Sequence, residues 1–154
     1  LSTHELGYMQ HSARESFKLI DFEYPLSIAK LAYDSGARSI ALVSAVGAQE
    51  GSFNYYFHIK GKLENEIRKI GYKNICFARP GHLLGARKDF RGYEIPILES
   101  GLRIAAPFMQ GPLKNFRQIE ARQVAERMVM NLLNKQKGES YLYYEDFLKT
   151  ETFE

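Results

Sequence analysis

Apolar residues in the first half of the chain alternate between helical spacing and short continuous runs. From about residue 13 to residue 35 they recur every three or four positions, which predicts one helical face: Phe17, Ile20, Tyr24, Ile28 and Leu31. Pro25 lies within this segment and is expected to kink or split the helix. A second helical face is predicted over about 54–70, where Asn54 opens the segment and Gly71 ends it.

Each of these helices is followed by a short apolar run. The runs are SIALVS at 39–44 and NICFA at 74–78. Continuous apolar runs of this length are typical of strands buried on both faces of a parallel sheet. The order helix, strand, helix, strand therefore predicts an α/β fold with right-handed crossovers.

The second half of the chain has a less regular pattern. It predicts a basic loop at 82–92, a helix at 93–106 and irregular backbone at 107–118. An amphipathic helix is predicted over about 120–134, followed by a strand at 141–144 and a short helix at 145–149.

Composition limits the class of protein. The chain has 154 residues, of which 45% are hydrophobic and 25% charged, so we expect one globular domain. The net charge of +3 is spread without a basic run, and no apolar run could span a membrane, so neither a nucleic-acid nor a membrane partner is expected. No secretory signal is evident, and the single cysteine, Cys76, fits a reducing compartment, which favours a cytoplasmic location. The histidines lack metal-ligand spacing, so no metal site is expected.

Tyr56 and Lys60 are the first candidates for chemistry. They lie four residues apart on the predicted second helix, which puts both side chains on one face. An ammonium beside a phenol lowers the tyrosine pKa, and such a tyrosine can act as general acid or base. The pair alone is weak, because about 0.7 such pairs are expected by chance in a chain of this composition.

Two further segments are expected near this pair. Ser44 ends the first predicted strand, and Arg79-Pro80-Gly81 follows the second. Ligands of open α/β sheets bind at the carboxyl ends of the strands, so these residues should share one edge with Tyr56.

Four stretches in this order and spacing resemble the atypical short-chain dehydrogenases/reductases, in particular the Tat-interacting-protein-like group. They are LVSAVGA (42–48), YYFHIKGKLE (55–64), FARPGHLLG (77–85) and FRQIEARQVAERM (116–128). The similarity runs from about Phe17 to Leu148. The resemblance implies a Rossmann-like, NAD(P)-binding parallel sheet with flanking helices.

The resemblance also implies roles for individual residues. Tyr56 matches the catalytic acid/base, Lys60 the lysine that lowers its pKa and holds the nicotinamide ribose, and Ser44 the serine that orients the substrate carbonyl. These three residues would also contact the cofactor. The other cofactor-binding positions implied are Ser2, Thr3, Pro80 and Gly81.

The chain departs from the family pattern at its start. It has no Gly-rich turn between a first strand and a helix, and about 60 residues of two βαβ-type units are expected before Leu1. Residues 1–154 would then form the C-terminal part of a single Rossmann-like domain, with a small substrate-side region at about 82–118. The cofactor would be NADP or NAD. We expect a second copy or the missing N-terminal segment to cover the exposed sheet edge.

The function implied is hydride transfer between NAD(P) and an unknown small-molecule carbonyl substrate, with Tyr56 transferring the proton. The alternative is a non-enzymatic module on the same fold that senses the cofactor or binds a protein. Upstream sequence and turnover of a carbonyl panel would discriminate between the two.

Overall fold

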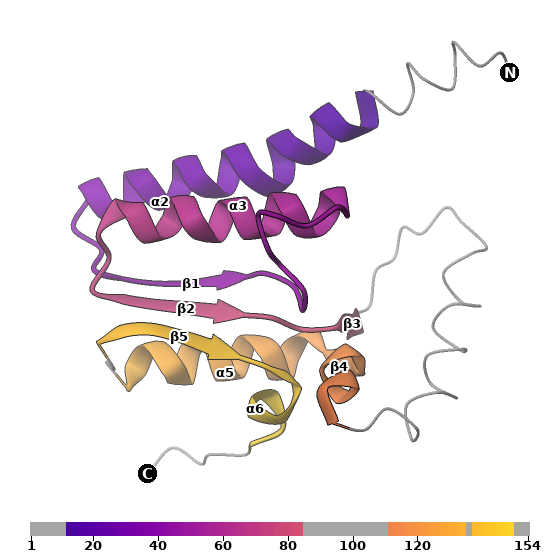
Figure 1. The fold of residues 1–154 in the computed structure, drawn as a ribbon. Helices are drawn as coiled ribbons and strands as arrows, with labels where there is room; N and C mark the ends of the chain where they lie inside the picture. The colour runs from indigo at the N-terminus through magenta and orange to yellow at the C-terminus, as the bar shows by residue number, and fades with distance from the viewer. Residues whose placement is uncertain (1–11, 85–110, 135–136, 150–154) are drawn as a thin grey trace, which may run out of the picture. The chain divides into compact units, whose positions relative to one another are not determined.

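The computed structural model describes residues 12–84, 111–134 and 137–149, which form two compact units. One unit contains the described residues up to Ile40 together with Gly47–Lys73, and the other contains Ala41–Val46 and the described residues from Asn74 onward. Figure 1 shows the elements in chain order. They are η1 (Leu19–Glu23), α2 (Tyr24–Asp34), β1 (Ser39–Val43), α3 (Tyr55–Ile70), β2 (Asn74–Ala78), β3 (His82–Leu84), η3 (Gly111–Phe116), β4 (Gln118–Glu120), α5 (Ala121–Leu133), β5 (Gly138–Leu142) and α6 (Tyr144–Leu148).

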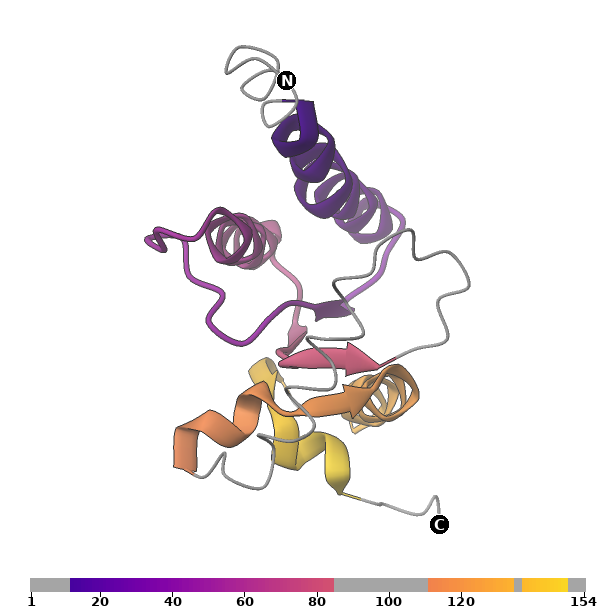
Figure 2. The ribbon, with the colours of Figure 1, turned by 90° about the vertical axis from the view of Figure 1, so that its right-hand side faces the viewer.

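The fold is α/β, with a parallel sheet flanked by helices, as the sequence predicted. The strand order is β1-β2-β5, and a second sheet pairs β3 with β4 in parallel. The β2–β5 register runs from Asn74 opposite Gly138 to Ala78 opposite Leu142. Figure 2 shows the strands of the three-stranded sheet nearly end-on. The predicted parallel pairing of the first two strands is thereby confirmed.

The ends of α3 have identifiable causes. The Asn54 side chain accepts hydrogen bonds from the backbone N–H groups of Tyr56 and Phe57, at 2.9 and 3.4 Å. At the other end, Gly71 has a φ of 101°, a left-handed conformation that glycine adopts without strain. Ile59, Leu63 and Ile67 are buried, so the predicted apolar face of this helix forms core.

The core of the second unit lies between β2, β5, α5 and α6. Its members are Cys76, Ala78, Ile119, Val124, Leu142 and Phe147. Cys76 and Ala78 alternate with Phe77 along β2 and therefore point to one face of the strand. Met128 and Leu132 of α5 pack against the same cluster, which confirms the amphipathic face predicted for this helix.

The first helical segment differs from its prediction in two ways. Residues 12–34 stay helical through Pro25, because a π turn at η1 precedes it and the Tyr24 N–H bonds to the Leu19 carbonyl. The wider turn accommodates the residue that lacks an N–H. The predicted apolar face is also largely exposed in the described chain, at Ile20, Tyr24, Ile28 and Leu31.

Other predictions need correction as well. β1 is only half-buried, because it is an edge strand of the described sheet and pairs on one side alone. β5 begins three residues earlier than predicted, because its register with β2 sets its start at Gly138. η3 and β4 replace part of the irregular segment. The predicted helix at 93–106 lies outside the described residues, and the single domain with a substrate-side region at 82–118 stays a prediction.

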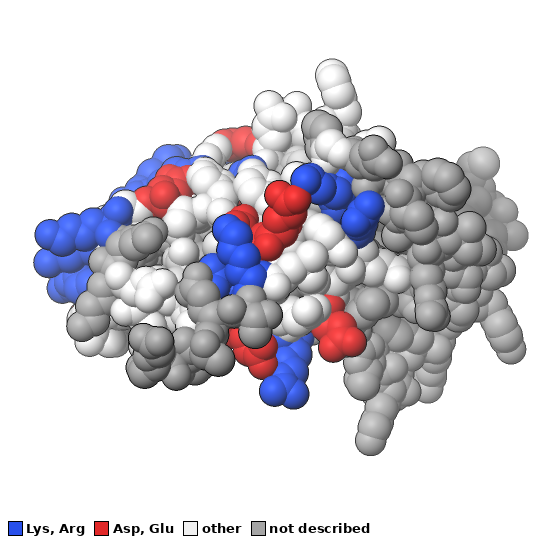
Figure 3. All heavy atoms as spheres, turned by 90° about the horizontal axis from the view of Figure 1, so that it is seen from below, with Lys and Arg blue, Asp and Glu red and all other residues white. Residues whose placement is uncertain are grey.

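Charged side chains of both signs are interspersed over the face seen in Figure 3. Ion pairs of the described residues include Arg122 with Glu126 on α5, and Lys149 with Asp146 of α6. The described surface on this face is therefore mixed in sign.

Candidate functional site

Tyr56 lies in the first turn of α3, two residues after the Asn54 cap. The residue is 41% exposed. Phe17 and Phe57 lie beside it, with ring centroids 5.7 and 5.4 Å from that of Tyr56. The ring of Tyr56 is therefore held among other aromatic rings while part of it stays open to solvent.

Lys60 lies one helical turn further along α3. Its Nζ is 5.8 Å from the centre of the Tyr56 ring, so the structure brings the two predicted residues together. The ammonium donates a 2.6 Å hydrogen bond to Oδ1 of Asp21 in η1. The side chains of Lys60 and Asp21 are 12% and 28% exposed. A charge this poorly solvated needs a counterion, and Asp21 supplies it.

The expected lowering of the Tyr56 pKa is wrong for this structure. Burial raises the pKa of Tyr56 above its ordinary value, and the Asp21 carboxylate raises it further. Both effects disfavour the phenolate, since a negative charge is poorly solvated there and is repelled by Asp21. Tyr56 is consequently a protonated phenol at neutral pH. The catalytic role expected of it stays a prediction.

Ser44 lies in the second unit, directly after β1. It is 3% exposed, and its Oγ has no hydrogen-bond partner among the described residues. The Ser44 N–H bonds to the Ala78 carbonyl at 2.7 Å, and the Val46 N–H bonds to the Pro80 carbonyl at 3.1 Å. The backbone segments that follow β1 and β2 therefore run side by side at the carboxyl edge of the sheet.

The predicted site residues thus fall into separate groups. Tyr56 and Lys60 belong to the first unit, whereas Ser44, Pro80 and Gly81 belong to the second. A Cβ at Gly81 would collide with the backbone of Asn115 and Phe116, so this glycine is required for packing. Ser2 and Thr3 lie outside the described residues.

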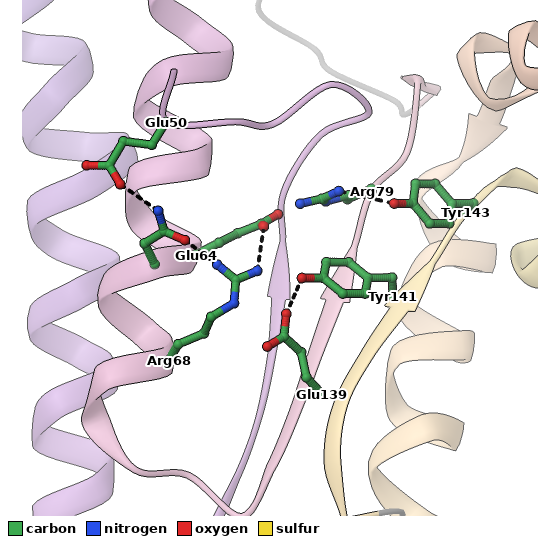
Figure 4. Close-up of polar contacts among 8 residues, drawn as sticks. Glu50, Glu64, Arg68, Arg79, Glu139, Tyr141 and Tyr143 are labelled. Atoms are coloured by element: carbon green, nitrogen blue, oxygen red, sulfur yellow. Dashed lines mark hydrogen bonds and ion pairs between the residues drawn. The ribbon is translucent and has the colours of Figure 1, made fainter. Parts of the chain in front are cut away.

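Arg79 was missed by the sequence reasoning as an individual residue. Its guanidinium donates to the Tyr143 hydroxyl at 3.1 Å and lies 4.5 Å from the centre of the Tyr141 ring (Figure 4). Tyr141 in turn donates a hydrogen bond to Glu139. The predicted tyrosine-rich strand therefore packs around an arginine at the end of β2.

Glu64 was also missed, and it is a buried carboxylate. It lies one turn beyond Lys60 on α3 and is bound by Arg68 at 3.3 Å, as Figure 4 shows. Tyr56, Lys60 and Glu64 follow one another at four-residue spacing, a signal that the sequence contains. Asp21 carried no comparable signal, because it lies 39 positions before Lys60.

Other kinds of site find little support in the described residues. They contain no cluster of three or more His, Cys, Asp or Glu that could hold a metal ion. Burial raises the pKa of the Cys76 thiol, which disfavours the reactive thiolate. Within the same residues, no helix has the length and apolar character needed to cross a membrane.

Mitochondrial proteins of several yeasts are similar to this chain. "Protein FMP52, mitochondrial" of Candida albicans is 39% identical over 101 residues, which are 65% of this chain and 44% of that protein. The protein of the same name in Debaryomyces hansenii is 41% identical over 78 residues, 51% of this chain and 34% of its own length. The Saccharomyces cerevisiae protein of that name is 38% identical over 70 residues, which are 46% of this chain and 30% of that protein.

The matched part of the chain therefore spans less than half the length of these curated relatives. No family model matches the chain.

These comparisons contradict two expectations. The resemblance to the atypical short-chain dehydrogenases/reductases is not supported, because the relatives' name indicates no dehydrogenase or reductase and no family model of that group matches. Short motifs on a common α/β fold are a weak guide to family, since many unrelated functions use the same fold. The cytoplasmic location is contradicted by the relatives' names, which state mitochondrial. A single cysteine reports the redox state of a compartment and not its identity.

Proposed function

We propose that the protein transfers hydride between a nicotinamide dinucleotide and a carbonyl compound, with Tyr56 as the proton donor. The observation that carries the proposal is the unsatisfied Ser44 Oγ at the carboxyl edge of the parallel sheet. A buried hydroxyl without a partner costs about 1–3 kcal/mol, which a substrate oxygen bound there would recover. Ligands of α/β sheets bind at this edge.

Tyr56 supports the proton-transfer half of the proposal. The Tyr56 hydroxyl carries its proton at neutral pH, as a phenol with an ordinary or a raised pKa does, and this is the proton that a carbonyl oxygen would take. In that step the Tyr56 O–H bond breaks, an O–H bond forms on the substrate, and the electron pair stays on the Tyr56 oxygen. Solvent then returns a proton to Tyr56.

Each unit by itself offers groups suited to the nicotinamide end of a dinucleotide. Bound there, the cofactor, NADP or NAD, would supply the hydride. Lys60 has three donor hydrogens and uses one on Asp21, so two are available for ribose hydroxyls. Ser44, Pro80 and Gly81 share the sheet edge on which a nicotinamide ring would lie. The described residues contain no Gly-rich turn opening a helix after a strand, so the phosphates would need other residues.

The test uses the complete gene product with each nicotinamide cofactor and a panel of neutral and charged carbonyl compounds. Tyr56→Phe should lower turnover by about 10²-fold and leave cofactor affinity unchanged, because the hydroxyl donates the proton but hardly holds the dinucleotide. Tyr55→Phe is the matched control, since Tyr55 is the neighbouring tyrosine and its hydroxyl bonds to the Arg14 carbonyl instead. Equal turnover for Tyr56→Phe and wild type would contradict the role assigned to Tyr56.

The second candidate is a module that binds the cofactor or a protein without catalysis. The Asp21–Lys60 ion pair favours it, because a lysine neutralised by a carboxylate stabilises a phenolate less than a free lysine does. Cofactor binding by calorimetry, with no hydride transfer to any member of the carbonyl panel, would support this candidate over the enzyme.

We also propose a mitochondrial location, supported by the printed names of the yeast relatives. A tagged complete gene product should fractionate with mitochondria. Recovery in the cytosolic fraction alone would contradict the location.

A further inference from the structure

Asp21 occupies an unusual place in the first helical segment. It lies in the π turn η1, where the backbone takes one extra residue per turn. Such turns change the direction of nearby side chains and are frequent at functional sites. Here the turn contains Asp21, whose carboxylate reaches Lys60 on α3. One short ion pair therefore joins two elements that are distant in sequence.

The surroundings of Tyr56 limit which charges act on it. From α3, the neighbouring cation is Lys60, and from η1, the anion is Asp21. From residues 12–18, Lys18 pairs with Glu23 at 3.0 Å, and the Arg14 guanidinium lies 5.3 Å from the centre of the Tyr55 ring. Lys62 of α3 faces the ring of Phe22. Asp21 and Lys60 are therefore the charged pair beside Tyr56 among the described residues.

We propose that Asp21 is a positioning residue that anchors the Lys60 ammonium beside Tyr56 and thereby sets the pH range over which Tyr56 exchanges a proton with the substrate. This inference rests on the proposed function, because it assigns a pH dependence to that reaction. Reduction needs the Tyr56 proton on a phenol. Oxidation of an alcohol needs a phenolate to accept the alcohol proton, while an oxidised nicotinamide takes the hydride.

Removing the Asp21 charge has a predictable electrostatic result. In Asp21→Asn the Lys60 ammonium loses its counterion, and the negative charge that opposes the phenolate is gone. Both changes favour the phenolate. The Tyr56 titration should shift to lower pH, and alcohol oxidation at neutral pH should rise by about 3–10-fold.

The first experiment reads the titration directly. The complete gene product is labelled with ¹³C at the tyrosine Cζ, and the Tyr56 signal is identified by its loss in Tyr56→Phe. Asp21→Asn should shift this titration to lower pH, and Asp21→Glu should restore much of the wild-type behaviour. Glu23→Gln is the matched control, because it removes the same charge from the same turn but from the partner of Lys18. An unchanged Tyr56 titration in Asp21→Asn overturns the inference.

A second variant keeps the inference testable if Asp21→Asn does not fold. Lys60→Gln removes the cation and leaves Asp21 in place, so the Tyr56 titration should move to higher pH. A shift to lower pH, or none, overturns the inference even where Asp21→Asn fails to fold. Thermal melting followed by circular dichroism identifies variants that are folded.

Kinetics then separate this inference from the proposed function. The oxidation and reduction rates of wild type and Asp21→Asn are compared across pH with one alcohol and carbonyl pair. Titration shifts without any hydride transfer would refute the proposed function, and with it the pH dependence assigned to the reaction, while retaining the anchoring role of Asp21. Hydride transfer in both proteins, with the same pH profiles for oxidation and for reduction, would refute the role of Asp21 and retain the proposed function.

Discussion

The two groups of candidate residues differ in how the cost of burying a polar group is compensated. Around Tyr56, a poorly solvated ammonium is paired at 2.6 Å with the carboxylate of Asp21. At the end of β1, the Ser44 hydroxyl is buried without a partner among the described residues. An ion without a counterion costs far more than an unsatisfied hydroxyl, so the protein pairs the first and tolerates the second.

This difference indicates where a ligand would gain binding free energy. The Lys60 group is already neutralised internally and offers donors but little unbalanced charge. The Ser44 hydroxyl still has an unmet hydrogen bond that a bound oxygen could complete. Substitutions in the two units should therefore show which residues contribute to the free energy of unfolding and which contribute to turnover.

The largest effect is expected in the first unit, at Gly61. It follows Lys60 on α3, and a Cβ there would fall inside contact distance of the Gln49 and Glu50 backbone. Gly61→Ala should lower the free energy of unfolding by about 3 kcal/mol, because the loop must move away from the helix. Chemical denaturation measures the change. At Gly51 in the same loop, a Cβ would meet only the Gln49 Nε2 at 4.0 Å, an ordinary van der Waals contact, so Gly51→Ala serves as control. Similar losses for both variants would refute the steric explanation.

A smaller loss is expected in the second unit, at Val124. This residue is 2% exposed in the core cluster, whereas Val129 on the same helix is 52% exposed. Val124→Ala should lower the free energy of unfolding by about 2 kcal/mol, and Val129→Ala by less than about 0.5 kcal/mol. If denaturation gives equal values, α5 does not pack through Val124.

Ser44→Ala should affect stability and function in opposite directions. Removing a buried hydroxyl without a partner should leave the free energy of unfolding unchanged or raise it by up to about 1 kcal/mol. Turnover of a carbonyl substrate should fall by about tenfold, because the substrate loses a hydrogen bond. Calorimetric unfolding and steady-state kinetics on the complete gene product measure the two effects. Marked destabilisation would mean that Ser44 has a structural partner.

The smallest effects concern pH, and they differ between the units. Burial alone would raise the Asp146 pKa, but hydrogen bonds from Lys149 and the Tyr143 N–H lower it below 3.8. The stability from this carboxylate is present above its unfolded pKa and is lost as pH falls through the folded one. The Tyr56 pKa is raised above 10.0, so its contribution is present below that pH and is lost as pH rises through the folded pKa.

Unfolding measured across pH should therefore show a small acid limb that Asp146→Asn removes and a small alkaline limb that Tyr56→Phe removes. Each should amount to less than about 1 kcal/mol, because both side chains are partly solvated. Persistence of either limb in its variant would mean that other groups are responsible.

The local pattern of the sequence was sufficient for elements whose ends carry their own signals. The Asn54 cap and Gly71 bound α3, and the apolar run at 74–78 coincides with β2. Spacing also placed Tyr56 beside Lys60, because residues four apart on a helix are neighbours. These features depend on contacts within a few residues, so sequence alone determined them.

Only the tertiary structure decided what depends on distant residues. The start of β5 is set by its register with β2, and the partner of Lys60 comes from a turn 39 positions earlier. The Tyr56 pKa moves upward and not downward for the same reason, since burial and the Asp21 carboxylate both raise it. Burial, counterions and strand register are properties of packed chains, and helical spacing carries no information about them.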